Sequence, residues 1–388
     1  MVMAGGVAKE KKKIVAVVFL SFQKALSLIL AFLLLFTNFL KVESAPINET
    51  LLILNTTNIS IHYDQKHPVS NSVYEELVDL AKICSISYCT STNELYPGDF
   101  VDACPLKECV NGNHKNSKII KVFQPPEEQK GPSGFIGINH EKKKIYIVFR
   151  GSETNSDWLS NLDIKPTKYI PHVIQNYKVD KKNIEFNCEN CLVHRGFYKS
   201  LSFFFEDSYS DVQKISQQYP NYQLVITGHS LGGALATLMA VEYKLLGFNP
   251  LAVTFGSPKV AVNNAMSKAI DNFLKTLFNY NNLSNIGNLE SGLYRVIHKG
   301  DFVPLLPPSY KHVGTLLTID KFLFPHEQKD LKAVLPTEEN EESLPPELTT
   351  ENINSDSWKE SYLKYYLFRD HRNYFIRISG CVDRTTDK

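Results

Sequence analysis

The stretch LVITGHSLGGALATLMAV, residues 224–241, passes from a β-branched apolar run through two glycines into a run of small residues. The first part is typical of a buried strand, and the last part is typical of a closely packed helix. Gly228 and Gly232 permit a tight turn between the two, and such a turn lifts the side chain of Ser230 clear of the sheet. Gly-x-Ser-x-Gly alone is a weak signal, but the strand before it and the helix after it predict a nucleophilic serine.

A serine hydroxyl is a good nucleophile near pH 7 only when a histidine takes its proton and an acid holds that histidine. In proteins with this kind of turn the acid and the histidine follow the serine in that order. Asp301 fits the acid, because it stands three residues beyond a β-branched strand in LYRVIHKGDFVPLLP (293–307). His312 and His371 both fit the base, and the sequence spacing leaves the choice between them open.

The other histidines are interpreted as structural. His298 stands too close to Asp301 in the chain to be its obvious partner, and it belongs to the preceding strand. The same interpretation covers His62, His67, His114, His140, His172 and His326.

Strands and helices alternate around the serine turn. Their alternation predicts an α/β fold with a central, mostly parallel sheet flanked by helices. The apolar spacing predicts strands at 118–123, 134–139, 143–149, 223–227, 251–255 and 293–298, and helices at 72–89, 196–218, 231–246 and 262–278.

The composition indicates a globular protein. Of the 388 residues, 43% are hydrophobic, which is ample for a packed core. The formal net charge of the whole chain is +1. Residues 1–45 carry six lysines and two glutamates, so the rest of the chain carries about −3 and has no basic surface for nucleic acid. We expect one catalytic domain at 71–388, with a solvated acidic insertion at 336–352.

The N-terminal region predicts entry into the secretory pathway. A lysine cluster precedes a long apolar run, which is typical of a signal peptide over residues 1–44 or of an uncleaved membrane anchor. A polar lead-in at 45–70 follows, and Val42 and Ser44 suit a cut before Ala45. Glycosylation sequons stand at Asn48, Asn55, Asn58 and Asn282.

Seven cysteines suit an oxidising compartment. We expect local disulfides between Cys104 and Cys109 and between Cys188 and Cys191. The spacing leaves open which of Cys84 and Cys89 pairs with Cys381, and the other stays a free thiol. The Cys-x-x-Cys of CENC (188–191) could instead be a redox or zinc site, but no second such pair accompanies it.

An amphipathic stretch follows the strand at 143–149. Trp158, Leu159 and Leu162 share one helical face, polar residues occupy the others, and Pro166 ends the pattern. The residues by themselves fit an ordinary surface helix with its apolar side on the core.

Seven blocks together resemble the fungal class-three triacylglycerol lipases. The resemblance runs from about residue 72 to residue 381 with the blocks in family order, and CENCLVHRGF is most similar to the extracellular yeast lipases. The blocks are VFRGS, SDWLSNLD, LVHRGFYKS, GHSLGGALA, FGSPKV, YRVIHKGDFVPLLP and DHRNYF. After FGSPKV the chain reads AVNN where the family usually has Gly then Asn or Asp, which puts the detail of that loop in doubt.

This resemblance implies the α/β-hydrolase fold, with a helical lid over the site. It implies Ser230 as the nucleophile, Asp301 as the acid and His371 as the base, with His312 structural. It also implies an oxyanion hole made by Ser152 and by the backbone N–H of Leu231. Trp158, Leu159 and Leu162 would belong to the lid, and His194 and Gly196 would be structural.

We therefore expect a serine hydrolase of carboxylic esters, a triacylglycerol lipase that works through an acyl-enzyme at lipid surfaces without a metal or an organic cofactor. Its partners would be a lipid ester substrate and the lipid–water interface. A phospholipase A1 or a general carboxylesterase is the alternative within the enzymes. A non-catalytic binding module with the same fold is the alternative outside them.

Overall fold

The computed structural model describes residues 66–90, 92, 94–124, 133–152, 163–176, 186, 188–275, 288–334, 370–378 and 380–381. The chain divides into the units 1–60 and 61–388, and all of the described residues belong to the second unit. Several predictions therefore lie outside the described residues. These are the signal or anchor at 1–44, the four sequons, the lid residues Trp158, Leu159 and Leu162, and the acidic insertion at 336–352.

A nine-stranded sheet forms the centre of this unit, in the order β1-β11-β10-β9-β8-β7-β4-β3-β2. The five central strands are parallel to one another, and antiparallel strands continue the sheet at both edges. The strands are β1 (Lys66–Pro68), β2 (Lys118–Phe123), β3 (Gly134–Asn139), β4 (Lys144–Phe149), β7 (Gln223–His229), β8 (Leu251–Phe255), β9 (Gly292–His298), β10 (Thr315–Ile319) and β11 (Leu331–Val334).

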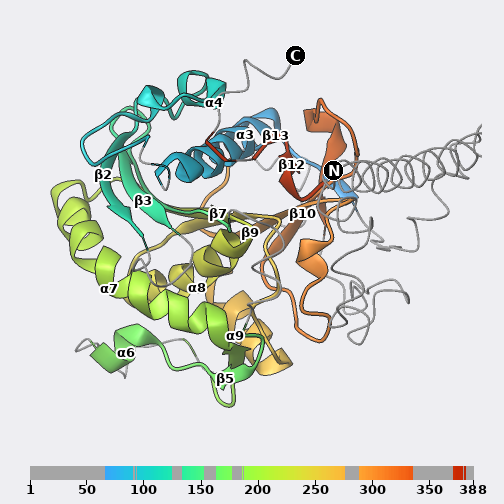
Figure 1. Cartoon of the computed structure of the whole chain (residues 1–388). Helices are drawn as coiled ribbons and strands as arrows, with labels where there is room; N and C mark the ends of the chain where they lie inside the picture. Colours follow the sequence, from blue (N-terminus) through green and yellow to red (C-terminus); the bar gives the residue numbers. More distant parts are fainter. Residues whose placement is uncertain are drawn as a thin grey trace, which may run out of the picture. The chain divides into compact units, whose positions relative to one another are not determined.

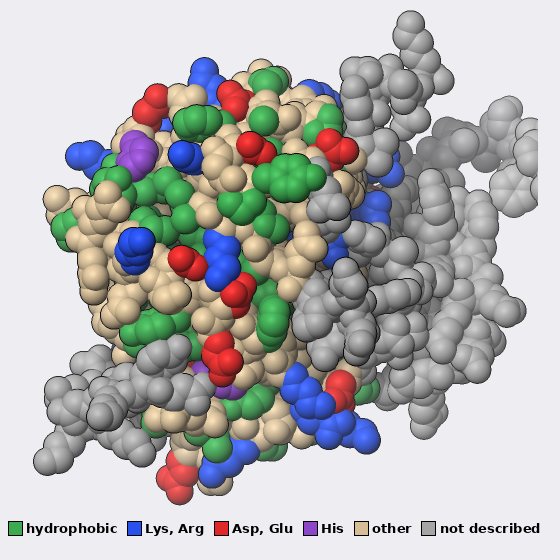
Figure 2. Space-filling view, turned by 60° about the vertical axis from the view of Figure 1, so that its left-hand side comes forward, with side chains coloured by type: hydrophobic (Ala, Val, Ile, Leu, Met, Phe, Trp, Pro, Cys, Tyr) green, Lys and Arg blue, Asp and Glu red, His purple; other side chains and the backbone are tan. Residues whose placement is uncertain are grey.

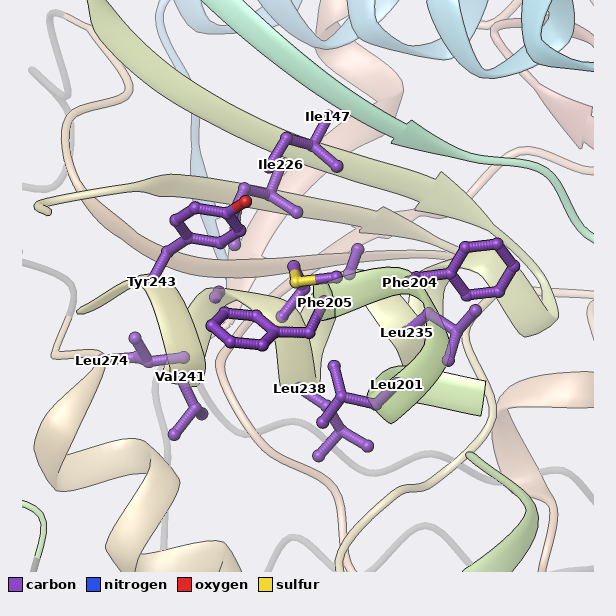
Figure 3. Packing of buried hydrophobic residues seen from close by; sticks show 14 of the residues in the cluster. Ile147, Leu201, Phe204, Phe205, Ile226, Leu235, Leu238, Val241, Tyr243 and Leu274 are labelled. Carbon is purple, nitrogen blue, oxygen red and sulfur yellow. The ribbon is translucent and has the colours of Figure 1, made fainter. Parts of the chain in front are cut away.

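Helices cover both faces of the sheet, as Figure 1 shows. α3 (Asn71–Ile86) lies on one face, while α7 (Arg195–Gln218) and α8 (Leu231–Leu245) lie on the other with α9 (Asn264–Phe273) near them. Successive strand side chains point to opposite faces, so each face has its own core. Ile147 and Ile226 pack toward α7 and α8 (Figure 3), whereas Tyr146 and Val225 belong to the core around α3.

Shorter elements complete the unit. A two-stranded ribbon pairs the segment after Asp163 with the segment before α7. The remaining elements are η1 (Ser87–Thr90), η2 (Val101–Ala103), α4 (Lys107–Val110), β5 (Pro166–Lys168), α6 (His172–Asn176), β6 (Leu192–His194), η5 (Val303–Leu305), η6 (Gln328–Asp330), η8 (Asp370–Arg372), β12 (Asn373–Tyr374) and β13 (Ile376–Arg377).

The predicted fold class is confirmed, and the predicted strands and helices agree with the structure to within a few residues, apart from a helix end at α9. The neighbouring strands β1 and β11, at one side of the sheet, were not predicted. β1 lies inside the stretch that we interpreted as a polar lead-in, and it pairs antiparallel with β11. In the described part of the chain, no helix has both the length and the hydrophobicity that a membrane span needs.

Three disulfides are present, and they include both predicted local pairs, Cys104–Cys109 and Cys188–Cys191. Cys89 is the partner of Cys381, which settles the choice that the sequence left open. Cys84 is the free thiol; it is buried, and burial raises its pKa to about 12. Among the described residues no cluster of His, Cys, Asp and Glu could hold a metal ion.

Candidate active site

Ser230 occupies a sharp turn between β7 and α8. Its φ is 59°, a backbone conformation that residues other than glycine rarely adopt. A Cβ atom on Gly228 would lie 2.3 Å from the carbonyl oxygen of Gly232, and one on Gly232 would lie 2.2 Å from the carbonyl oxygen of Phe149. Both glycines are therefore required for the close approach of α8 to the sheet, as the sequence predicted. The turn places Ser230 at the first turn of a 15-residue helix.

Asp301 and His371 contact each other directly, although 70 residues separate them. Nδ1 of His371 donates to the Asp301 carboxylate, at 3.0 Å from Oδ1 and 2.9 Å from Oδ2. This bond fixes the tautomer in which Nε2 is the basic nitrogen. Oδ1 also accepts the backbone N–H of Val303 at 2.9 Å, and Oδ2 accepts the hydroxyl of Tyr374 at 2.5 Å. Both residues of the pair are buried.

His229 connects the serine turn to the histidine that contacts Asp301. Its Nε2 donates to the backbone carbonyl of His371 at 2.7 Å, and its Nδ1 accepts the hydroxyl of Tyr88 at 3.0 Å. The ring centroids of His229 and His371 lie 4.7 Å apart. Burial holds the pKa of His229 well below its ordinary value, so the ring stays neutral and keeps this bonding pattern. The turn at Ser230 and the turn at His371 are thus packed side by side.

The predicted oxyanion-hole residues lie beside the same turn. A Cβ atom on Gly151 would lie 2.9 Å from the Cβ atom of Ser230, so Ser152 follows a residue in close contact with the serine. Leu231 is the first residue of α8, where backbone N–H groups carry partial positive charge. The predicted lid residues lie outside the described part of the chain, between Ser152 and Asp163.

Asp163, the first described residue after that segment, is bonded to the start of α7. Arg195 forms two hydrogen bonds with the Asp163 carboxylate, each of 2.6 Å, and this lowers the pKa of Asp163 to about 2. The backbone N–H of Gly196 donates to the carbonyl of Asp163 at 3.1 Å. His194 caps α7 and stacks on Phe197, which fits the structural role expected for it.

His298 and His312, the other histidines near Asp301 in the chain, have different positions. His298 ends β9; its Nε2 donates to the carbonyl of Lys321 at 2.9 Å, and its Nδ1 accepts the N–H of Gly300 at 3.2 Å. These bonds shape the loop that carries Asp301. His312 stands before the amino end of β10, whereas Ser230 and Asp301 follow the carboxyl ends of their strands. The structure therefore brings His371, and not His312, to the carboxylate of Asp301.

Tyr374 and Tyr88 were missed as site residues. Tyr374 lies in the DHRNYF block, three residues after His371, and its hydroxyl also accepts the backbone N–H of His298 at 3.2 Å. In the sequence, only the position of Tyr374 three residues after His371 could have indicated its place in the site. Tyr88 lies more than a hundred residues before the serine, and no local pattern indicates its contact with His229.

Comparisons with known proteins assign the family. The model of the family described as Lipase (class 3) matches residues 146–311. The candidate lipase LIH1 of Saccharomyces cerevisiae is 32% identical over 333 residues, which cover 83% of this chain and 98% of that protein. The chain belongs to the class 3 lipases. The predictions of this family and of lipase activity are thereby confirmed.

Other proteins similar to this class 3 lipase are also named lipases. The secreted mono- and diacylglycerol lipase 2 of Gibberella zeae is 28% identical over 67% of this chain and 65% of its own length. The crystal structure of the Lip2 lipase from Yarrowia lipolytica superposes with a TM-score of 0.61 and 23% identity, covering 82% of this chain and 98% of that one. At that identity the superposition supports the α/β-hydrolase fold. The family match ends at residue 311, before His371, so the contact with Asp301 comes from the structure alone.

Proposed function

We propose that this lipase hydrolyses triacylglycerols through an acyl-enzyme formed on Ser230, with His371 as the base and Asp301 as the acid. The observation that carries the proposal is the hydrogen-bonded pair of His371 and Asp301 packed beside the strained serine turn. A serine, a histidine and a carboxylate in this chain order are the elements of acyl transfer on this fold.

The chemistry follows from these groups. Oγ of Ser230 attacks the ester carbonyl while Nε2 of His371 takes its proton, and the Asp301 carboxylate stabilises the imidazolium that forms. The N–H groups at Ser152 and Leu231 would stabilise the negative charge on the carbonyl oxygen. His371 then gives the proton to the departing alcohol, and a water molecule, activated by the same histidine, releases the fatty acid.

The substrate class and the location are part of the proposal. Relatives named as secreted mono- and diacylglycerol lipases support an acylglycerol substrate and secretion. The apolar N-terminal segment and the cluster of sequons support the same location. We further propose that the segment with Trp158, Leu159 and Leu162 is a lid that opens at the lipid–water interface.

A hydrolysis panel of triolein, phosphatidylcholine and tributyrin tests the proposal. We expect hydrolysis of triolein, little of phosphatidylcholine, and a rise in the tributyrin rate above its solubility limit. A preference for phosphatidylcholine would indicate a phospholipase A1. A tributyrin rate that rises smoothly through the limit would contradict the lid, and no hydrolysis of any ester would contradict the enzyme.

A further inference from the structure

Three consecutive large apolar residues are exposed in the loop after β10. Phe322 is 39% exposed, Leu323 70% and Phe324 42%, and Leu323 is the most exposed of the large hydrophobic side chains in the described chain. We call residues 322–324 the apolar tip. Single exposed apolar residues are ordinary and occur elsewhere on the surface (Figure 2), whereas three in succession form one continuous apolar stretch of the loop.

The apolar tip lies at the same edge of the sheet as the candidate active site. β9 and β10 are parallel, and their last residues, His298 and Ile319, are paired in register. Asp301 and Phe322 each follow three residues later, so both loops leave the sheet at its carboxyl edge. Ser230 follows β7, which lies three strands from β10 in the sheet. The ends of β7 and β10, and so the serine turn and the apolar tip, are therefore roughly 14 Å apart along that edge.

The loop that carries the tip is anchored at both ends. Nζ of Lys321 donates to the carbonyl of Pro325 across the tip at 2.6 Å. His326 is buried; its carbonyl accepts the hydroxyl of Tyr74 at 2.8 Å, and its Nδ1 accepts the N–H of Phe375 at 3.2 Å. The loop is therefore held at both ends, and the same anchor contacts the segment that carries His371.

Phe322 also contacts the Asp301 loop. A ring carbon of Phe322 lies 3.1 Å from the position that a Cβ atom on Gly300 would take, and its ring centroid lies 6.2 Å from that of His298. The ring centroid of Phe324 lies 4.7 Å from that of His326. Phe322 thus packs on the site loop and Phe324 packs on the anchor at His326, which leaves Leu323 as the most exposed residue of the tip.

Three lysines around the tip lie in ion pairs, and a fourth, Lys299, has its ammonium group 5.4 Å from the centroid of the Phe322 ring. Lys321 lies 3.8 Å from Asp330, and Lys329 lies 2.6 Å from Glu327. At the base of the loop Lys66 lies 2.9 Å from Asp320. With three ion pairs and this one further lysine, the surroundings of the tip carry little net charge, which favours an uncharged apolar partner over a strongly charged one.

We propose that the apolar tip inserts into the uncharged acylglycerol–water surface and holds the active-site edge of the sheet against it. This inference rests on the proposed function, because it assigns the surface through which that site meets its substrate. It is separate from the lid, since the tip follows β10 and the lid segment follows β4. Transfer of one large apolar side chain out of water is worth about tenfold or more in binding.

Two double variants test the proposal. L323S/F324S removes two side chains of the tip and keeps Phe322 on the site loop. The change at Phe324 also removes its ring contact with His326, so the soluble ester serves to detect any effect on the active site. Y96S/V110S is the matched control, because Tyr96 and Val110 are 55% and 53% exposed and belong to the segment before β2, at the far end of the strand order. Each variant is assayed as the full chain on a triolein emulsion of increasing surface area and on a soluble short-chain p-nitrophenyl ester. Flotation with the emulsion measures binding directly on an S230A background, and sedimentation measures the oligomeric state.

We expect L323S/F324S to need about 10- to 100-fold more emulsion surface for half-saturation. Its kcat/KM on the soluble ester should stay within about twofold of the parent, and binding should change little between 0.1 M and 1 M salt. The control should match the parent in both assays.

Unchanged emulsion binding in L323S/F324S would overturn the proposal, and it would point to a segment of this chain as the cover of the tip. A parallel loss on the soluble ester would assign the loop to the support of the active site instead. A parent dimer that the variant dissociates, with emulsion binding intact, would assign the tip to a second copy. If the parent hydrolyses no ester at all, the proposed function fails, while flotation still tests the tip.

Discussion

Ser230 has a backbone conformation that costs of order 1–3 kcal/mol for a residue other than glycine. Its neighbours hold it there. The N–H of Ser230 donates to the carbonyl of Phe255 at 2.9 Å, and its carbonyl accepts the N–H of Gly233 at 2.9 Å. A serine in this strained conformation lowers the stability of the fold, and such strain is typical of functional residues.

His229 holds His371 in position through the hydrogen bond from its Nε2 to the His371 carbonyl. We predict that H229A lowers kcat on a soluble short-chain ester by about 10- to 100-fold, with KM within about twofold, because the carbonyl of His371 loses its donor. Y88F should lower kcat only a few-fold, since it removes one hydrogen bond to the His229 ring.

Steady-state kinetics across pH checks this prediction. Misplacement of His371 should also move the pH at which kcat is half-maximal, which a loss of folded protein would not do. His140 is an exposed histidine bonded to Tyr222, and H140A serves as the control. Wild-type kcat in H229A would contradict the positioning role.

At the scale of elements, α8 connects the site to the interior of the molecule. Its first turn touches β4 through Gly232, and its last turns bury Glu242. Oε1 of Glu242 accepts the hydroxyl of Tyr169 at 2.8 Å, and Oε2 accepts the N–H of Val173 at 3.0 Å. This carboxyl group ties α8 to the segment that follows the predicted lid.

Glu242 should make stability depend on pH. Burial raises its pKa to about 7 from 4.5, so the folded state keeps a proton that the unfolded state releases as the pH rises. Its stabilising contribution is full below pH 4.5 and is lost as the pH rises through 7. We predict that between pH 4.5 and pH 8 the wild type loses roughly 3 kcal/mol more unfolding free energy than E242Q.

Denaturant unfolding at several pH values measures this difference. E206Q, which changes an exposed glutamate of α7, should follow the wild type. Equal pH dependence in the wild type and E242Q would show that Glu242 has no such shift.

The long elements could be predicted from sequence because their patterns are local. β7 is a β-branched apolar run and α8 is a run of small and apolar residues, both buried almost throughout, and the glycines between them specify the turn. β1, with three residues, and β11, with four, carry too few side chains for a pattern, and their partners lie far away in the chain. The contacts of Tyr374 and Tyr88 depend on that same long-range folding.

At the scale of the whole molecule, the site is assembled from distant parts of the chain. Ser230 and Asp301 follow parallel strands of one sheet, so the topology brings them to one edge. His371 belongs to no strand of that sheet. The C-terminal segment that carries it is fixed by the Cys89–Cys381 disulfide, which joins residues 292 positions apart, and by the bond from His229.

This assembly explains why the base was ambiguous in the sequence. His312 and His371 both follow Asp301, and residue types alone do not show which edge of the sheet each one reaches. The resemblance to a family favoured His371 through the DHRNYF block, and the structure adds its contact with Asp301. Chain order therefore limited the candidates, and topology distinguished them.

The most direct test of the triad is the rate at which a fluorophosphonate labels the full-length protein, with the labelled residue mapped by mass spectrometry. We predict fast labelling of the wild type at Ser230 alone, and labelling at least about 100-fold slower in H371A, because the serine then lacks its base. Labelling at another residue, or H371A labelled at the wild-type rate, would contradict it.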